Sequence, residues 1–225
     1  MKKVSVILPA AGSGKRFGSD SNKIFQLLDG REVFLRTIDL FAKRDDVCQI
    51  LMVVSPDDAA RLLMEFCEEL AELGVELVDG GAERSDSVRN ALARLDEAAE
   101  LVCVHDSVRP CVTSEQIDAV FAAAGDTGAA ILAYPLHGTI KKVDSSGRIV
   151  KTVDRDGLWE AQTPQVFEKN LLLEAYSLGG QATDDAETVQ RTGAEVTVVA
   201  SGPNNVKITA PADLLLAEAV MRSDR

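Results

Sequence analysis

The segment VSVILPAAGSGKRFG, residues 4–18, joins a short apolar run directly to a loop of glycines and basic residues. The run VSVILPA (4–10) has the composition and length of a buried β-strand. In an open α/β sheet, ligands bind at the carboxyl ends of the strands, where loops lead into helices. The segment therefore predicts an α/β protein with a ligand site at the end of its first strand.

Short apolar runs alternate with longer amphipathic segments along the rest of the chain. Further strands are expected at 49–55, 75–81, 101–106 and 129–136, and helices at 33–44, 57–73, 85–95 and 114–124. The alternation resumes after residue 157 and ends in a helix from about Pro211. This pattern predicts a Rossmann-like, mostly parallel sheet with helices on both faces. Without a long linker or an internal repeat, residues 1–225 are expected to form a single domain.

The segment at 137–157 departs from this alternation. It contains GTIKKVDSSGRIVKTVDRDG, in which polar and apolar residues alternate around a Ser-Ser-Gly turn, as is typical of a β-hairpin. Its polar composition predicts more exposure than for the core strands, so we expect an arm that projects from the domain. The alternative is an edge hairpin whose charges prevent aggregation.

Composition restricts the class of partner. A formal net charge of −12 argues against a general nucleic-acid-binding protein, which needs a broad basic face. No stretch approaches the ~20 apolar residues of a membrane helix, so no membrane contact is expected. The cysteines lack CxxC spacing and predict buried free thiols in a reducing cytoplasm; they are Cys48, Cys67, Cys103 and Cys111. The local basic cluster of this acidic chain is better matched to a small anion.

The glycine-rich loop matches neither of two well-known phosphate-binding motifs. Gly12, Gly14 and Gly18 give GxGxxxG, which is one residue longer than the dinucleotide motif GxGxxG. A Walker A loop requires GxxxxGK[ST], but Pro9 stands for its first glycine and Arg16 for its Ser/Thr. The mis-spaced glycines and the basic residues argue against an NAD-dependent oxidoreductase.

The loop nevertheless has the chemistry of a polyphosphate site. Its glycines let backbone N–H groups approach an anion, and Lys15, Arg16 and Lys23 can surround several phosphates. The alternative is a Gly-rich turn with solvated basic residues, and the loop alone leaves both open.

Two further loops are expected at the same edge of the sheet. VHDSVRP (104–110) ends a strand with Asp106, and a carboxylate that faces a polyphosphate suits Mg²⁺ or another divalent cation. The alternatives for Asp106 are a helix N-cap or an ion pair with Arg109. DGGAERSDSV (79–88) supplies glycines and hydroxyls, or else only a turn and a helix cap.

Six motifs then occur in a fixed order over almost the whole chain: PAAGSGKRFG…NK, VDGGAERSDSV, VHDSVRP, TVDRDGLWEAQTPQVF, TDDAETV and NNVKIT. This ordered set resembles the 2-C-methyl-D-erythritol 4-phosphate cytidylyltransferases of the non-mevalonate isoprenoid pathway. The resemblance implies a reaction that joins CTP to a sugar-alcohol phosphate, with pyrophosphate as the second product. The alternatives are a ribitol-5-phosphate or other polyol-phosphate cytidylyltransferase and a non-catalytic nucleotide-binding module.

The resemblance also implies roles for individual residues. Arg16, Lys23 and Lys207 match the catalytic cations of the family, and Asp106 matches its Mg²⁺-associated acid. Contacts with CTP are implied for Ala10, Ala11, Gly12, Gly14, Lys15, Gly81, Arg84, Ser87 and Arg109. For Arg84, an ion pair at a helix start is the alternative.

The acceptor phosphate is expected to contact Thr139 and Arg155 on the arm, and Thr163 and Thr183 on the core. In this family the arm crosses between the subunits of a homodimer, so Thr139 and Arg155 are expected to serve the partner's site. His105 is interpreted as structural. The chain departs from the usual family pattern at Asn22 and Ile24, which bear on the rigidity of the loop and on the acceptor, and at Gly138, which bears on the acceptor. A fourth departure, Asn204, bears on the affinity for Mg²⁺ or substrate.

Overall fold

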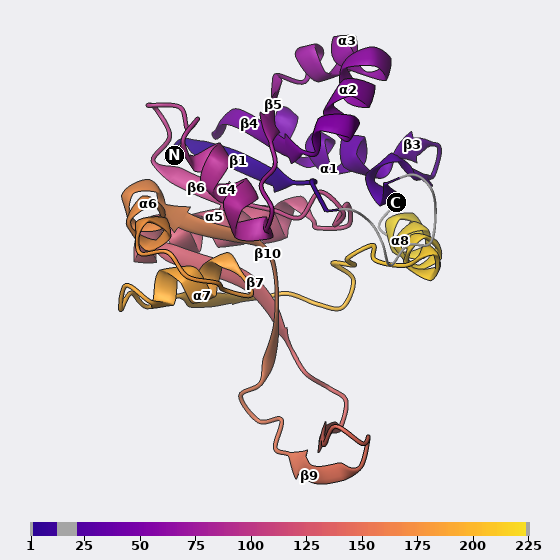
Figure 1. The fold of residues 1–225 in the computed structure, drawn as a ribbon, viewed down its shortest axis with the longest axis vertical. Coiled ribbons are helices and arrows are strands. Elements are labelled where there is room, and N and C mark those ends of the chain that lie inside the picture. The colour runs from indigo at the N-terminus through magenta and orange to yellow at the C-terminus, as the bar shows by residue number, and fades with distance from the viewer. Residues whose placement is uncertain (1, 13–21, 224–225) are drawn as a thin grey trace.

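The computed structural model describes residues 2–12 and 22–223. A seven-stranded sheet lies at its centre, with the order β11–β7–β10–β6–β1–β4–β5 (Figure 1). Parallel pairing joins β1 (Val4–Pro9) to β4 (Val47–Val54) and β6 (Leu101–Val104), β4 to β5 (Val75–Asp79), and β7 (Ala129–Pro135) to β11 (Thr197–Ala200). Only β10 (Trp159–Glu168), among the strands described, runs antiparallel to its neighbours in this sheet. The predicted mostly parallel α/β fold is confirmed.

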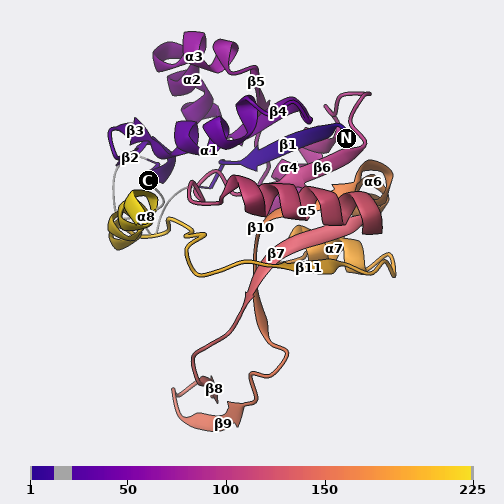
Figure 2. The same ribbon diagram turned by 180° about the vertical axis from the view of Figure 1, so that it is seen from behind.

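Helices cover both faces of the sheet because alternate strand residues are apolar on both sides. Leu8 and Met52 belong to one buried cluster, whereas Ile7 and Leu51 belong to the other. The first cluster includes residues of α1 (Val33–Ala42), α2 (Pro56–Glu65), α3 (Cys67–Glu72), α5 (Ser114–Thr127) and α8 (Pro211–Ser223). The second includes residues of α4 (Arg84–Leu92), α6 (Lys169–Ser177) and α7 (Asp185–Gln190). Figure 2 shows α5 lying across the face that Figure 1 hides.

The single helix predicted at 57–73 is wrong, because the chain forms α2 and α3 with a break at Phe66. Phe66 has a φ of −133°, outside the helical region. Its ring packs edge-on to Phe34, with centroids 5.2 Å apart, and also stacks on Phe25 of the short helix η1 (Lys23–Phe25). Packing of one aromatic ring against the core therefore overrides a continuous helical pattern.

Strand β10 was not predicted from the sequence. Its middle contains two polar residues, Gln162 and Thr163, and then Pro164, which has no backbone N–H to donate. These residues interrupt the apolar pattern of a strand. Register with β7 shifts between Ala161 and Gln165, at the same place. These residues are buried all the same, and they bring polar side chains beside the end of β6.

The predicted arm is confirmed as a hairpin of β8 (Ile140–Val143) and β9 (Ile149–Val153). The two strands form a sheet of their own that projects from the body (Figures 1 and 2). Gly147 in the turn has a φ of 81°, which favours glycine. A second, small hairpin is made by β2 (Leu27–Leu28) and β3 (Arg31–Glu32).

All four cysteines are free thiols, as predicted. Cys103 and Cys111 are buried, but Cys67 is exposed, so the prediction of burial is wrong for that residue. In the described part of the chain, no helix combines the length and the apolar character needed to span a bilayer.

Candidate functional site

A pocket of about 280 Å³ lies at the carboxyl ends of β1, β5 and β6. The chain passes from β1 to β4 and β5 on one side and then returns to place β6 on the other side of β1. Such a reversal in strand order opens a crevice between the loops of the two central strands. The pocket therefore occupies the position at which an open α/β sheet binds its ligand.

Nine of the residues predicted to bind or react with the nucleotide line this pocket: Ala10, Ala11, Gly12, Lys23, Gly81, Arg84, Ser87, Asp106 and Lys207. They come from four segments that are far apart in the sequence. Gly14, Lys15 and Arg16 lie outside the described residues, so their roles stay predictions.

A larger cavity of about 610 Å³ lies at the opposite ends of β1 and β6, beside α5. Its two basic side chains are already engaged: Arg44 pairs with Asp46 and Asp118, and Lys2 donates to the carbonyl of Gly125. We place the candidate site at the smaller pocket, because that pocket combines converging cations with backbone approach from glycine loops.

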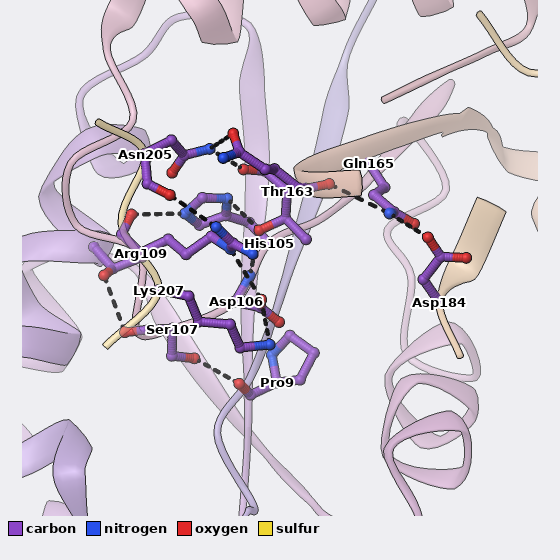
Figure 3. A network of polar contacts seen from close by, with 12 residues as sticks. Pro9, His105, Asp106, Ser107, Arg109, Thr163, Gln165, Asp184, Asn205 and Lys207 are labelled. Carbon is purple, nitrogen blue, oxygen red and sulfur yellow. Dashed lines mark hydrogen bonds and ion pairs between the residues drawn. The ribbon is translucent and has the colours of Figure 1, made fainter. Parts of the chain in front are cut away.

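Asp106 is the most strongly constrained charge in the pocket. Its Oδ2 lies 2.8 Å from Nζ of Lys207 and 3.2 Å from Nε of Arg109 (Figure 3). Its Oδ1 lies 4.0 Å from Nε of Arg84. Burial by itself raises the pKa of Asp106, but the charges of Lys207, Arg84 and Arg109 outweigh it and hold the pKa well below its ordinary value. A carboxylate with three cations around it leaves net positive charge, which suits an anionic ligand.

His105 supports the Asp106 loop from behind. Its Nδ1 lies 3.1 Å from the hydroxyl of Thr163, and its Nε2 lies 3.1 Å from the carbonyl of Arg109 (Figure 3). The Thr163 hydroxyl in turn accepts from the backbone N–H of Asp106. Complete burial lowers the pKa of His105 to about 4, so the ring is neutral at pH 7. This arrangement agrees with the structural role interpreted from the sequence.

The NNVKIT segment is fastened to the same loop. Arg109 is buried and donates from Nη1 to the carbonyl of Asn205 at 2.8 Å. The Asn205 amide donates to the carbonyl of Thr163 at 2.8 Å and to Gln162. Lys207 follows two residues later, so these contacts place its ammonium beside Asp106 (Figure 3). Arg109 lies behind Asp106, and direct contact between Arg109 and CTP stays a prediction.

Two of the loops predicted to contact CTP are packed closely at Gly80 and Gly81. A Cβ at Gly80 would lie 2.4 Å from Cβ of Ala11, and one at Gly81 would lie 2.3 Å from Cβ of Asp86. Both distances are shorter than carbon atoms tolerate. The Gly81 N–H donates to the Ser87 hydroxyl at 3.0 Å, which fixes the turn at the start of α4. Side chains are therefore excluded at Gly80, where the two loops meet, and at Gly81, where the turn packs against α4.

Asn22 connects the two described ends of the glycine-rich segment. Its side-chain amide donates to the carbonyls of Ala10 and Gly12 and to Asp58 of α2, the last at 2.9 Å. Its carbonyl oxygen accepts from the N–H of Ile24. The next residue is Lys23, so the position of this lysine is set by side-chain hydrogen bonds of its neighbour.

Known proteins that resemble this chain identify its family. The family model described as 2-C-methyl-D-erythritol 4-phosphate cytidylyltransferase matches residues 4–223. The chain belongs to this family. A protein of that name from Rhodopirellula baltica is 44% identical over 99% of this chain and 96% of its own.

Solved structures agree with this membership. A 4-diphosphocytidyl-2C-methyl-D-erythritol synthase from Anaerococcus prevotii superposes with a TM-score of 0.83 at 29% identity, covering 98% of this chain and 99% of that one. A 2-C-methyl-D-erythritol 4-phosphate cytidylyltransferase from Thermus thermophilus gives 0.80 at 33% identity, with the same coverage.

Asp185 was not predicted from the sequence as a site residue. The motif TDDAETV was noted, but only Thr183 was singled out as a site residue. The structure places the Asp185 carboxylate, which is fully buried, 2.8 Å from Nη2 of Arg84. The ion pair suspected for Arg84 therefore exists, while Arg84 also lines the pocket. The signal was an acidic residue in the apolar pattern of a helix start, next to a second acid that caps the helix, Asp184.

The acceptor residues predicted for this family are not brought together within one chain. Thr139 and Arg155 are exposed on the arm. The arm projects from the body of the molecule (Figures 1 and 2). The Arg155 guanidinium donates to the carbonyl of His137 at the arm's base. Thr183 is exposed at the start of α7, where its hydroxyl donates to Glu187, and Thr163 is buried beside Asp106. One chain thus divides these four residues between the core and the arm.

Proposed function

We propose that this chain transfers the cytidylyl group of CTP to 2-C-methyl-D-erythritol 4-phosphate. The products are 4-diphosphocytidyl-2-C-methyl-D-erythritol and pyrophosphate. The match over residues 4–223 and the relatives named for this activity support the proposal. The chain is a CTP-dependent nucleotidyltransferase of the non-mevalonate isoprenoid pathway. The observation that carries the proposal is Asp106 at the end of β6, held among Lys207, Arg109 and Arg84 in a pocket lined by glycine loops.

The reaction needs positioning and positive charge more than proton transfer. An oxygen of the acceptor phosphate attacks the α-phosphorus of CTP, and the bond to the β-phosphate oxygen breaks to release pyrophosphate. Because the attacking oxygen is already an anion, no general base is required. Lys23 and Lys207 reduce the repulsion between the two anions and stabilise the charge of the transition state. His105 is neutral and faces away from the pocket, toward Thr163 and Arg109, and takes no part as a base.

The residues present fit Mg²⁺ that enters with the nucleotide. Asp106 is ionised and lines the pocket, and Mg²⁺ commonly binds one or two carboxylates together with phosphate oxygens. Among residues 2–12 and 22–223, no cluster of three or more His, Cys, Asp or Glu side chains forms a complete metal cage. Mg²⁺ bound with the nucleotide would neutralise part of the charge of the triphosphate. Asp106 would hold the metal, while the ion pairs with Lys207 and Arg109 fix the Asp106 carboxylate.

The acceptor site is proposed to form between two subunits of a homodimer. The arm exposes apolar side chains that its own hairpin does not cover: Val143, Ile149 and Val150 are each at least half exposed. Exposed apolar groups of this kind mark contact surfaces. Arg155 and Thr139 on the arm of one subunit then bind the acceptor phosphate at the Asp106 pocket of the other. The cytoplasmic location stays a prediction.

The test is pyrophosphate release by the purified protein with CTP and Mg²⁺. Reactions with 2-C-methyl-D-erythritol 4-phosphate and with ribitol 5-phosphate are compared, and a reaction without acceptor measures background hydrolysis. Release with 2-C-methyl-D-erythritol 4-phosphate alone is expected. Release with ribitol 5-phosphate alone would keep the chemistry and replace the acceptor. Binding of CTP without release in either reaction would instead indicate a non-catalytic nucleotide-binding protein.

A further inference from the structure

We propose that Asp185 is a positioning residue of this reaction, because it holds the Arg84 guanidinium on the wall of the nucleotide pocket. The inference rests on the proposed function. It assigns a role to a residue that touches neither the pocket surface nor Asp106, and that acts only through Arg84.

The Asp185 carboxylate is prepared for one cationic partner. It is completely buried, and an ionised carboxylate in that position requires compensating contacts. Arg84 supplies the charge from Nη2 at 2.8 Å, and the Tyr176 hydroxyl of α6 donates to the other oxygen. The backbone is fixed as well, since the N–H groups of Asp185 and Ala186 both donate to the side-chain carbonyl of Gln165.

Arg84 joins this buried carboxylate to the pocket. It is the first residue of α4, about one third of its side chain is exposed, and it lines the pocket. Its Nε faces Asp106 at 4.0 Å, so the guanidinium lies between two carboxylates and is closer to the buried one. Without Asp185, the attraction of Asp106 would be unopposed, and the guanidinium would move toward Asp106. It would then leave the position that faces an incoming phosphate.

The same contact ties two halves of the site together. Arg84 begins the helix that follows the Gly80–Gly81 turn. Asp185 begins α7, two residues after Thr183, which is predicted to contact the acceptor phosphate. Gln165 completes the link, because its amide also donates to Asp184 at 3.0 Å (Figure 3). The ion pair with Asp185 thus joins Arg84 to the start of α7, next to Thr183.

The experiment is a double-mutant cycle on CTP affinity, measured calorimetrically with Mg²⁺ and without acceptor. Asp185→Asn keeps the size of the side chain and removes its charge. Because the contact is a charged hydrogen bond, we expect Asp185→Asn to weaken CTP binding about 10- to 100-fold. Arg84→Gln is expected to weaken it to a similar extent, and Asp185→Asn is expected to add little to Arg84→Gln.

A matched control separates positioning from stability. Asp46 is also buried and pairs with Arg44 at 2.8 Å, but at the opposite edge of the sheet from the nucleotide pocket. Asp46→Asn is expected to lower the melting temperature and to leave CTP affinity within about twofold of wild type, because distant sites act independently. Independent, multiplying losses in the Asp185/Arg84 cycle would overturn the proposal. So would a loss of CTP affinity in Asp46→Asn as large as that in Asp185→Asn.

A second cycle keeps the proposal testable if Asp185→Asn does not fold. Tyr176→Phe removes only the hydroxyl that orients the Asp185 carboxylate. We expect it to weaken CTP binding when Arg84 is present and to have no effect on CTP binding in Arg84→Gln; an equal effect in both backgrounds would contradict the proposal. The affinity measurements contain no acceptor and therefore do not depend on the transfer reaction. If the wild-type protein binds CTP but forms no product in the transfer assay, only the proposed reaction is refuted.

Discussion

The pocket and the arm differ in whether contacts within one chain hold their functional side chains in place. At the pocket, Asp106 is about 90% buried as a side chain, since only 10% of it is exposed, and side chains from three other positions contact it. On the arm, Thr139 and Arg155 are exposed, and β8 and β9 pair only with each other. A buried, mutually bonded set holds its geometry within a monomer, whereas the arm residues need a second surface. The pocket is therefore built into the fold of one chain, whereas the proposed acceptor site depends on the proposed dimer.

The largest effect is expected from removal of the arm. Deletion of 140–152 with a short glycine linker should give monomers that have lost transfer activity, because the acceptor residues no longer meet a partner's pocket. Ile140 pairs with Val153, so the ends to be joined are already adjacent. Light scattering after gel filtration measures the mass, and circular dichroism measures the fold. A dimer that survives the deletion would contradict the proposed arm-mediated assembly.

Lys23→Ala tests the pocket half of the comparison. Lys23 lines the pocket at the end of the glycine-rich segment, and it faces the triphosphate in the proposed reaction. Loss of one stabilising charge at a transition state costs about 10²- to 10³-fold in turnover, with the fold intact. The exposed Lys43 at the end of α1 provides the control, because Lys43→Ala removes an equal charge outside the pocket. Near-normal turnover of Lys23→Ala would remove Lys23 from the catalytic role.

Arg155→Ala tests the arm half, and we expect a smaller and more selective effect. An arginine that binds a phosphate as a charged fork contributes affinity for that ligand, so KM for the acceptor should rise about 10- to 100-fold. KM for CTP should change little. Arg148→Ala, at the exposed tip of the same arm, is the control. Equal effects on both substrates would argue against the arm as the acceptor site.

Mixed subunits then distinguish an arm that acts on its own chain from one that acts on its partner. Arg155→Ala has an intact pocket, and Lys23→Ala has an intact arm. If the arm acts across the dimer, random mixing restores about a quarter of wild-type activity, because half of the dimers gain one complete site. If it acts within its own chain, mixing restores nothing, since every site then lacks one of the two residues.

The sequence predicted those features that depend on periodicity and on ordered motifs. Alternating apolar runs predicted the parallel core strands, and the Ser-Ser-Gly turn predicted the arm. Glycine loops after two strands and Asp106 after a third predicted three loops at one edge of the sheet, because the carboxyl ends of parallel strands share an edge. The individual residues that line the pocket, Lys207 among them, were implied by the ordered motifs that resemble the family.

The features that were missed depend on contacts between distant residues. The break at Phe66 follows from aromatic packing with Phe34, which helical period does not contain. Strand β10 is polar in its middle because Thr163 and Gln165 bond to His105, Asp106 and α7, so its composition resembles a loop. Asp185 was missed for the same reason, since its burial and its partner Arg84 are set by tertiary structure.

The smallest effect is expected from the titration of His105 in the core. It concerns the free energy of unfolding and is smallest near neutral pH. Burial, partly opposed by the charge of Asp106, lowers its pKa from 6.5 to about 4 in the folded chain. As the pH falls, the His105 imidazole therefore binds a proton near pH 6.5 in the unfolded chain, but only near pH 4 in the folded chain. The stabilisation is complete above pH 6.5 and decreases as the pH falls toward 4, by at most about 3 kcal/mol.

Urea unfolding of wild type and of His105→Gln at several pH values between 4 and 7 measures this decrease. Gln retains a polar side chain beside Thr163 and Arg109 but does not titrate, so the free energy of unfolding should vary less with pH in the variant. His137 is present in both proteins and cancels in the comparison. Equal pH slopes would show that His105 does not titrate differently on unfolding. A shallower slope in the variant, with transfer activity of wild type unchanged from pH 7 to 8, would place His105 in the support of the pocket and outside its chemistry.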